Sequence, residues 1–162
     1  MNSIQESALL PKERTNSPIH PSCLVNELLV EYQQTNKNYW TDRAPSYSTQ
    51  HQGELRGSQH RDQHLIQLTN NSDRSSVHIL DIGCGPGFFS IILAELGYTV
   101  TAIDYTESML EQAKNNALSC KQTISFAQMD AENLSFSENS FDAIVSRNLT
   151  WNLPHPSNAY NE

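Results

Sequence analysis

Apolar residues in the second half of the chain fall into short runs, and polar or helically spaced stretches separate these runs. Short runs rich in β-branched residues predict strands, whereas apolar residues that recur every three or four positions predict helices. The first helix ends before Gly97, and the second begins behind Thr106, a residue type favoured as an N-cap. The predicted elements are a strand at 77–82, a helix at 88–96, a strand at 98–103, a helix at 106–117, and strands at 123–128 and 141–146.

Strands that alternate with helices form parallel βαβ units, in which helices cover the sheet. The sequence therefore predicts an α/β fold, with a doubly wound, Rossmann-like and mainly parallel sheet formed by residues 77–162.

The first half of the chain is more polar. Residues 1–21 contain three prolines among polar residues and are expected to form a disordered tail. Residues 22–76 are expected to form a helical cap segment and a loop, because apolar residues recur at helical spacing after Ser22 and again within 55–68. Pro45 is expected to break any helix in this segment.

Charge and cysteine content narrow the classes of protein to consider. The chain has 162 residues, with 18 acidic and 10 basic side chains and a formal net charge of −8, which disfavours a nucleic-acid partner. It contains no apolar run long enough for a membrane span, and its first residues do not resemble a signal peptide. Three scattered cysteines without metal-ligand spacing favour reduced thiols, a cytoplasmic location and no metal site.

A glycine-rich turn joins the first predicted strand to the first predicted helix. Gly83, Gly85 and Gly87 allow a tight turn there and let a ligand approach the backbone closely. The spacing is G-x-G-x-G, not the G-x-G-x-x-G of dinucleotide sites, and Asp81 precedes it. A carboxylate at that position would repel a pyrophosphate but could accept from an ammonium group. The turn therefore favours a small zwitterion with amino and carboxylate groups.

Two further acids follow the second and third predicted strands. Asp104 lies 21 positions after Gly83, the spacing at which a carboxylate binds ribose hydroxyls. Asp130 could bind an adenine amino group, with Ala131 offering a backbone N–H to the ring.

These motifs together resemble the class I S-adenosylmethionine-dependent methyltransferases of the methyltransferase-11-like type. The residues that carry the resemblance are Asp81 to Gly87, Asp104, the DAENL stretch at 130–134 and the SFDAIVS stretch at 140–146. The resemblance covers about residue 39 to the end of the chain and is most specific over 78–151.

The resemblance implies a role for each matching position. Asp81 and the loop of Gly83, Cys84, Gly85 and Gly87 would hold the methionine part of S-adenosyl-L-methionine. Asp104 would bind the ribose, Tyr105 would lie beside the adenine, and Asp130 and Ala131 would frame the adenine edge. Arg147 and Asn148 would lie under the methionine end and face a small-molecule acceptor, and Tyr47 could bind the cofactor carboxylate. The sequence assigns no catalytic residue; His51 and His155 are candidates for a general base by residue type alone.

Family members continue beyond the fourth strand, so the resemblance implies a truncated sheet of order 3-2-1-4 whose fourth strand is an exposed edge that invites self-association. The expected function is methyl transfer to a small-molecule acceptor, with neither nucleic acid nor membrane as a partner. Two alternatives remain open: a catalytically inactive cofactor-binding remnant, and a nicotinamide-dependent oxidoreductase.

Overall fold

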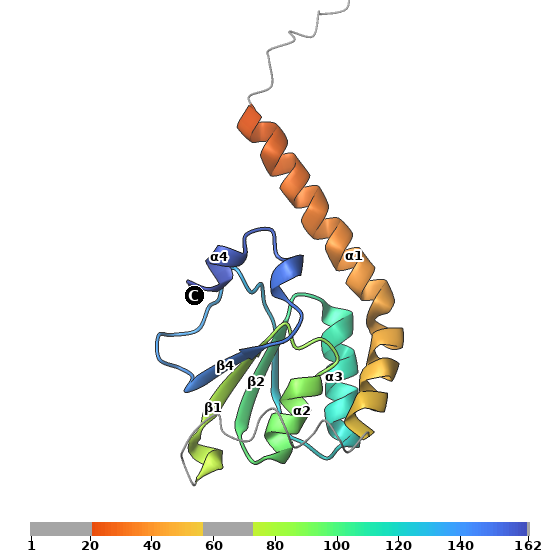
Figure 1. The fold of residues 1–162 in the computed structure, drawn as a ribbon, viewed down its shortest axis with the longest axis vertical. Helices are drawn as coiled ribbons and strands as arrows, with labels where there is room; N and C mark the ends of the chain where they lie inside the picture. The colour runs from red at the N-terminus through yellow and green to blue at the C-terminus, as the bar shows by residue number, and fades with distance from the viewer. Residues whose placement is uncertain (1–20, 57–72, 162) are drawn as a thin grey trace, which may run out of the picture.

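The computed structural model describes residues 21–56 and 73–161, and Figure 1 shows their arrangement. The expected disordered tail lies outside the described residues apart from Pro21, and most of the helical stretch expected within 55–68 also lies outside them. The elements are α1 (Pro21–Arg56), η1 (Arg74–Ser76), β1 (His78–Ile82), α2 (Phe88–Glu95), β2 (Thr99–Asp104), α3 (Glu107–Ser119), β3 (Ser125–Gln128), β4 (Ala143–Ser146), η2 (Thr150–Asn152) and α4 (Pro156–Ala159).

The four strands form one sheet in the order β3-β2-β1-β4, and every neighbouring pair is parallel. This confirms the predicted fold class and strand order. In the register of the sheet, Asp81 of β1 lies opposite Ala102 of β2 and Val145 of β4. Because all four strands are parallel, the loops that follow them gather at one edge of the sheet, which is where such folds bind ligands.

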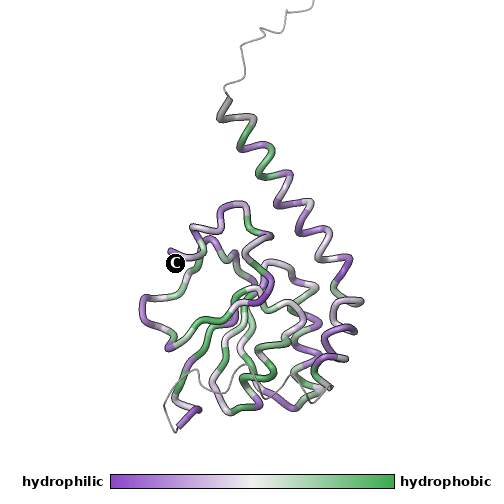
Figure 2. Tube along the Cα trace, in the orientation of Figure 1, coloured by the Kyte–Doolittle hydropathy of each residue, from purple (hydrophilic) through white to green (hydrophobic). Residues whose placement is uncertain are grey.

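Successive residues of β1 face opposite sides of the sheet, and each side has its own core. Ile79 is fully buried in a core to which α2 and α3 contribute, together with Leu55 from α1. Leu80 and Ile82 are buried on the other side, against residues of the segment that follows β3. Figure 2 shows green apolar positions along the strands and α2, whereas most of α1 is purple and polar.

The expectation that Pro45 would break a helix is wrong, because α1 runs unbroken through it. A proline lacks the N–H that would bond the carbonyl four residues earlier, here that of Thr41. The hydroxyl of Ser108 on α3 donates to that carbonyl oxygen at 3.5 Å. Ala44 and Ser48 on either side of the proline are buried. Contacts with the domain therefore outweigh the local cost of a helical proline, about 3 kcal/mol.

The two halves of α1 differ in their surroundings. The half that ends at Arg56 packs beside α3 and α2, whereas the half that begins at Pro21 projects beyond the sheet (Figure 1). Leu28 and Val30 in the projecting half are each 65% exposed. Within the described residues, no helix combines the length and apolar character that crossing a membrane requires.

Candidate functional site

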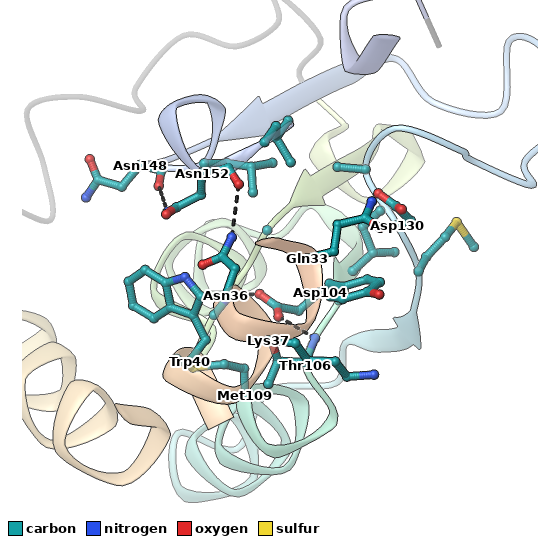
Figure 3. Close-up of a pocket in the computed structure, with 18 of the residues that line it drawn as sticks. Gln33, Asn36, Lys37, Trp40, Asp104, Thr106, Met109, Asp130, Asn148 and Asn152 are labelled. Atoms are coloured by element: carbon teal, nitrogen blue, oxygen red, sulfur yellow. Dashed lines mark hydrogen bonds between the residues drawn. The ribbon is translucent and has the colours of Figure 1, made fainter. Parts of the chain in front are cut away.

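Two adjoining cavities lie at the carboxyl edge of the sheet, beside α1. The main cavity has an empty volume of about 870 Å³, part of it open solvent, within the range of small-molecule sites. Figure 3 shows side chains of α1 facing those of the strand-end loops across it. Nine of the residues predicted from the sequence line this cavity: Tyr47, Gly83, Gly85, Asp104, Tyr105, Asp130, Ala131, Arg147 and Asn148.

The small cavity has an empty volume of about 290 Å³ and lies beside the glycine loop. It shares Tyr47, Gly83, Gly85 and Arg147 with the main cavity, and its other lining residues are His51, Asp81, Cys84, Phe88 and Phe89. Of the predicted site residues, only Gly87 lines neither cavity. A Cβ at Gly87 would lie 3.2 Å from the Cβ of Ala113, so this glycine allows α3 to pack closely against the loop.

Asp104 at the end of β2 holds the glycine loop in place. Its Oδ2 accepts a hydrogen bond from the backbone N–H of Gly85 at 2.9 Å, and its Oδ1 accepts from that of Thr106 at 2.8 Å. Burial raises the pKa of this carboxyl, and the two backbone donors oppose that rise. Each carboxylate oxygen can accept a second hydrogen bond, so Asp104 can brace the loop and bind a pair of hydroxyls at the same time.

Asp81 lies beneath the same loop and is 2% exposed. The hydroxyl of Ser90 on α2 donates to its Oδ2 at 2.5 Å. Burial raises the pKa of Asp81 to about 6, and the negative charge of Asp104 acts in the same direction. A cationic group placed in the small cavity would favour the ionised form of this carboxyl.

Cys84 fills space within the loop. Its side chain is buried, and this burial raises the pKa of the thiol well above its ordinary value. The nearby negative charges of Asp81 and Asp104 raise the pKa further. A thiol with a raised pKa stays protonated and is a poor nucleophile.

The loop after β3 forms another wall of the main cavity. Asp130 closes a short turn, in which its Oδ1 accepts from the backbone N–H of Glu132 at 2.9 Å. Ala131 within that turn is 6% exposed. His155 is tied to the same turn, because its backbone N–H donates to Glu132 at 2.8 Å and its Nδ1 lies 3.3 Å from that carboxylate. His155 therefore supports the wall and does not line the cavity itself.

Arg147, just after β4, links the sheet edge to α1. Its Nη1 lies 3.0 Å from Oε2 of Glu54, and its guanidinium carbon lies 4.5 Å from the ring centroid of Phe88. Both partners in the ion pair are partly exposed, so water screens the attraction between them. The pair holds the positively charged guanidinium of Arg147 at the boundary of the two cavities.

Of the α1 residues that line the main cavity, Tyr47 alone was among the site residues predicted from the sequence. Gln33, Asn36, Lys37 and Trp40 line it, and their spacing places them on one helix face. The side-chain amide of Asn36 donates to the backbone carbonyl of Asn152 at 3.0 Å, which joins α1 to the segment after β4. The positions were missed because three of the four are polar, and a search for helix faces by apolar periodicity passes over them.

Among residues outside α1, Met109, Met129, Leu149, Leu153 and Pro154 also line the main cavity and were not predicted. None of them belongs to the glycine-rich turn or to the acids that follow the strands, and these two motifs indicated the site in the sequence. Within the described residues, no group of three or more His, Cys, Asp or Glu side chains could hold a metal ion.

Comparisons with known proteins agree with this geometry. A family model described as a methyltransferase domain matches residues 79–162. The chain is 38% identical over 79 residues to the ubiquinone biosynthesis O-methyltransferase of Coxiella burnetii, covering 49% of this chain and 34% of that protein. It is 32% identical over 94 residues to the protein of that name from Nitrosococcus oceani, covering 57% of this chain and 40% of that one.

A solved structure from Methanococcus maripaludis, described as a "putative S-adenosyl-L-methionine-dependent methyltransferase", shares the fold with a TM-score of 0.51. It is 31% identical to this chain, covering 52% of this chain and 40% of that one. The chain spans from a third to two fifths of the length of these curated relatives. Because the family model matches more than half of its residues, the chain belongs to the methyltransferase domain family.

Proposed function

We propose that the chain binds S-adenosyl-L-methionine across the two cavities and transfers its methyl group to a small-molecule acceptor. The observation that carries the proposal is the convergence of Asp81, Asp104 and Asp130, from the ends of three strands, around one glycine loop. When bound, this cofactor supplies an activated methyl group on a sulfonium, so the protein needs chiefly to position the reactants and exclude water.

The residues present fit such a ligand. The main cavity offers Asp104 for ribose hydroxyls and the turn at Asp130 and Ala131 for a planar base. The small cavity offers an acid, Asp81, and a cation, Arg147, on its walls, which suits an amino-acid zwitterion. It also holds a buried imidazole nitrogen of His51 that has no hydrogen-bond partner among the described residues.

Trp40 and the carboxamides of Asn36 and Asn152 line the remaining part of the main cavity, and we assign the acceptor to this part. Trp40 packs against Trp151, with ring centroids 6.4 Å apart. A net charge of −8 supports a small molecule over a polyanion such as RNA. Cys84 and Cys120 are free thiols, which supports a cytoplasmic setting.

A nicotinamide-dependent oxidoreductase is the competing function. It would need to place a pyrophosphate against the glycine loop, above the carboxylates of Asp81 and Asp104. The family membership and these two acids both argue against it.

Calorimetric titration with S-adenosylhomocysteine and, in parallel, with NAD tests the proposal. Asp104→Ala should weaken S-adenosylhomocysteine binding by about 1.5–3 kcal/mol, the scale of a hydrogen bond to a charged group. Glu107→Ala, which removes an equal charge from an exposed position nearby, should leave affinity unchanged. Binding of NAD without binding of S-adenosylhomocysteine would refute the proposal.

A further inference from the structure

His51 on α1 is a buried histidine with an unsatisfied nitrogen. Its side chain is 5% exposed, and in the part of the chain that the structure describes its Nδ1 has no hydrogen-bond partner. Within the described residues it is the one buried side-chain nitrogen or oxygen in this condition. Buried polar atoms are nearly always paired, so an orphan in the wall of a cavity indicates a partner that comes from outside the protein.

The surroundings of His51 fix its position. Its ring centroid lies 4.2 Å from that of Tyr47 and 5.5 Å from that of Phe88, so the imidazole is held between two aromatic rings. Both of these rings also line the small cavity. A side chain packed in this way is already oriented before any ligand arrives, which lowers the entropy lost on binding.

The charge around His51 indicates what the partner must be. Burial lowers the pKa of the imidazole; among nearby charges Glu54 opposes this and Arg147 adds to it. At neutral pH the ring is therefore uncharged and offers one N–H donor. The titratable groups that share the wall of the small cavity with His51 are Tyr47, Asp81, Cys84 and Arg147.

An anionic acceptor of hydrogen bonds suits these donors. Arg147 supplies a positive charge to the small cavity, and α2 begins at Phe88 with backbone N–H groups that have no partner within the helix. Gly87, at the N-cap of α2, has no side chain to cap them, and the carboxylate of Asp81 accepts a hydrogen bond from the one at Ser90. Asp81 on the same cavity wall favours a cation instead, so the ligand group must carry both charges.

We infer that His51 donates a hydrogen bond from Nδ1 to the carboxylate of the ligand's amino-acid end, with Arg147 supplying the opposite charge. The inference rests on the proposed function and adds a residue to it. It assigns His51 to ligand binding and orientation, not to proton transfer with the acceptor, because His51 lines the small cavity and not the main one.

Two ligands separate this role from a structural one. S-adenosylhomocysteine carries the amino-acid end, whereas 5′-methylthioadenosine has the same nucleoside and thioether without it. His51→Phe keeps an aromatic ring between Tyr47 and Phe88 but removes both nitrogens. It should weaken S-adenosylhomocysteine binding by about ten- to a hundredfold, the scale of one hydrogen bond to a charged group, and leave 5′-methylthioadenosine binding unchanged.

His78→Phe is the matched control, since His78 at the start of β1 is exposed and lines neither cavity; it should alter neither affinity. Unchanged S-adenosylhomocysteine binding by His51→Phe would overturn the inference and leave the proposed function standing. An equal loss of affinity for both ligands would also overturn it, because it would indicate a packing role. If the wild-type chain binds neither ligand, the proposed function fails and this inference with it.

Nitrogen-15 NMR of the wild-type chain gives a second reading that does not depend on the variant folding. Addition of S-adenosylhomocysteine should move the Nδ1 resonance of His51 to that of a hydrogen-bonded, protonated nitrogen, and 5′-methylthioadenosine should not. An identical response to both ligands would contradict the assignment.

Discussion

Asn116 of α3 donates a 2.9 Å hydrogen bond to the backbone carbonyl of Pro86, within the glycine loop. The same amide group donates to the hydroxyl of Ser48, and its carbonyl accepts from Gln52 at 2.7 Å. Asn116 is 5% exposed. One buried side chain therefore joins the loop that would carry the ligand to α1, the helix that covers it.

Asn116→Ala should lower the free energy of unfolding by about 2–3 kcal/mol, because the buried Ser48 and Pro86 and the half-buried Gln52 each lose a hydrogen bond. Urea denaturation measures the loss. Asn115→Ala is the matched control, because Asn115 is the neighbour of Asn116 on α3 and is exposed. This substitution should have little effect on the free energy of unfolding. Equal effects of the two substitutions would show that the loop and α1 do not depend on this side chain.

Asp81→Asn should make the protein more stable at neutral pH. The folded protein raises the pKa of Asp81 from 3.8 to about 6, so it binds this proton more tightly than the unfolded chain does. Below pH 4 the proton on Asp81 therefore stabilises the folded state by about 3 kcal/mol relative to high pH. This contribution to the free energy of unfolding is lost as the pH rises through 6. The asparagine is neutral throughout and its carbonyl can still accept from Ser90.

Urea denaturation of Asp81→Asn and wild type from pH 4.5 to 7.5 measures this difference. The stability advantage of the variant should be largest at pH 7.5 and should shrink as pH falls toward 4.5. Glu107→Gln, which removes a charge from an exposed position, should show no such trend. A variant that is less stable than wild type at pH 7.5 would mean that the ionised Asp81 is favourably paired. The higher stability of Asp81→Asn at neutral pH should be accompanied by weaker binding of S-adenosylhomocysteine, because the ammonium group of this ligand loses its carboxylate partner.

Tryptophan fluorescence should report ligand binding through one of the two tryptophans in the chain. Trp40 is half-buried and lines the main cavity, whereas Trp151 is 67% exposed and does not. Titration with S-adenosylhomocysteine should change the emission of wild type and of Trp151→Phe but not that of Trp40→Phe. Retention of the signal in Trp40→Phe, with binding checked by calorimetry, would place the ligand elsewhere.

We expect β4 to mediate weak self-association. Within the described residues it pairs with β1 alone, and Ile144 on it is 58% exposed. An unpaired strand edge offers free N–H and C=O groups to a second copy, and a lysine on such an edge opposes pairing. Sedimentation equilibrium should show concentration-dependent association that Ile144→Lys reduces. A wild-type chain that stays monomeric at high concentration would contradict this expectation.

The sequence predicted the part of the site that depends on the sheet. Asp81, Asp104 and Asp130 could be placed together because apolar runs mark strands, and parallel strands end at one edge. The predicted strand at 98–103 also matches β2 to within one residue at each end.

The part that depends on α1 could not be predicted in the same way. Pro45 argues locally against a helix, and only its contact with the domain, such as the bond from Ser108 to Thr41, explains why the helix continues. His51 and Asn116 carry no motif, since their environment comes from elements distant in the sequence. Gly87 belongs to the glycine motif, but its position next to Ala113 depends on how closely α3 packs.

The long-range bonds of α1 also set an order of events during biosynthesis. Gln52 meets its α3 partner 64 residues later, Glu54 meets Arg147 after 93 residues, and Asn36 meets Asn152 after 116. At about 5–20 residues per second, a ribosome takes roughly 6–23 seconds to synthesise the longest of these intervals. The face of α1 that covers the ligand therefore stays exposed in the nascent chain until the rest of the domain has emerged from the ribosome. Chaperones would have access to this face during that interval.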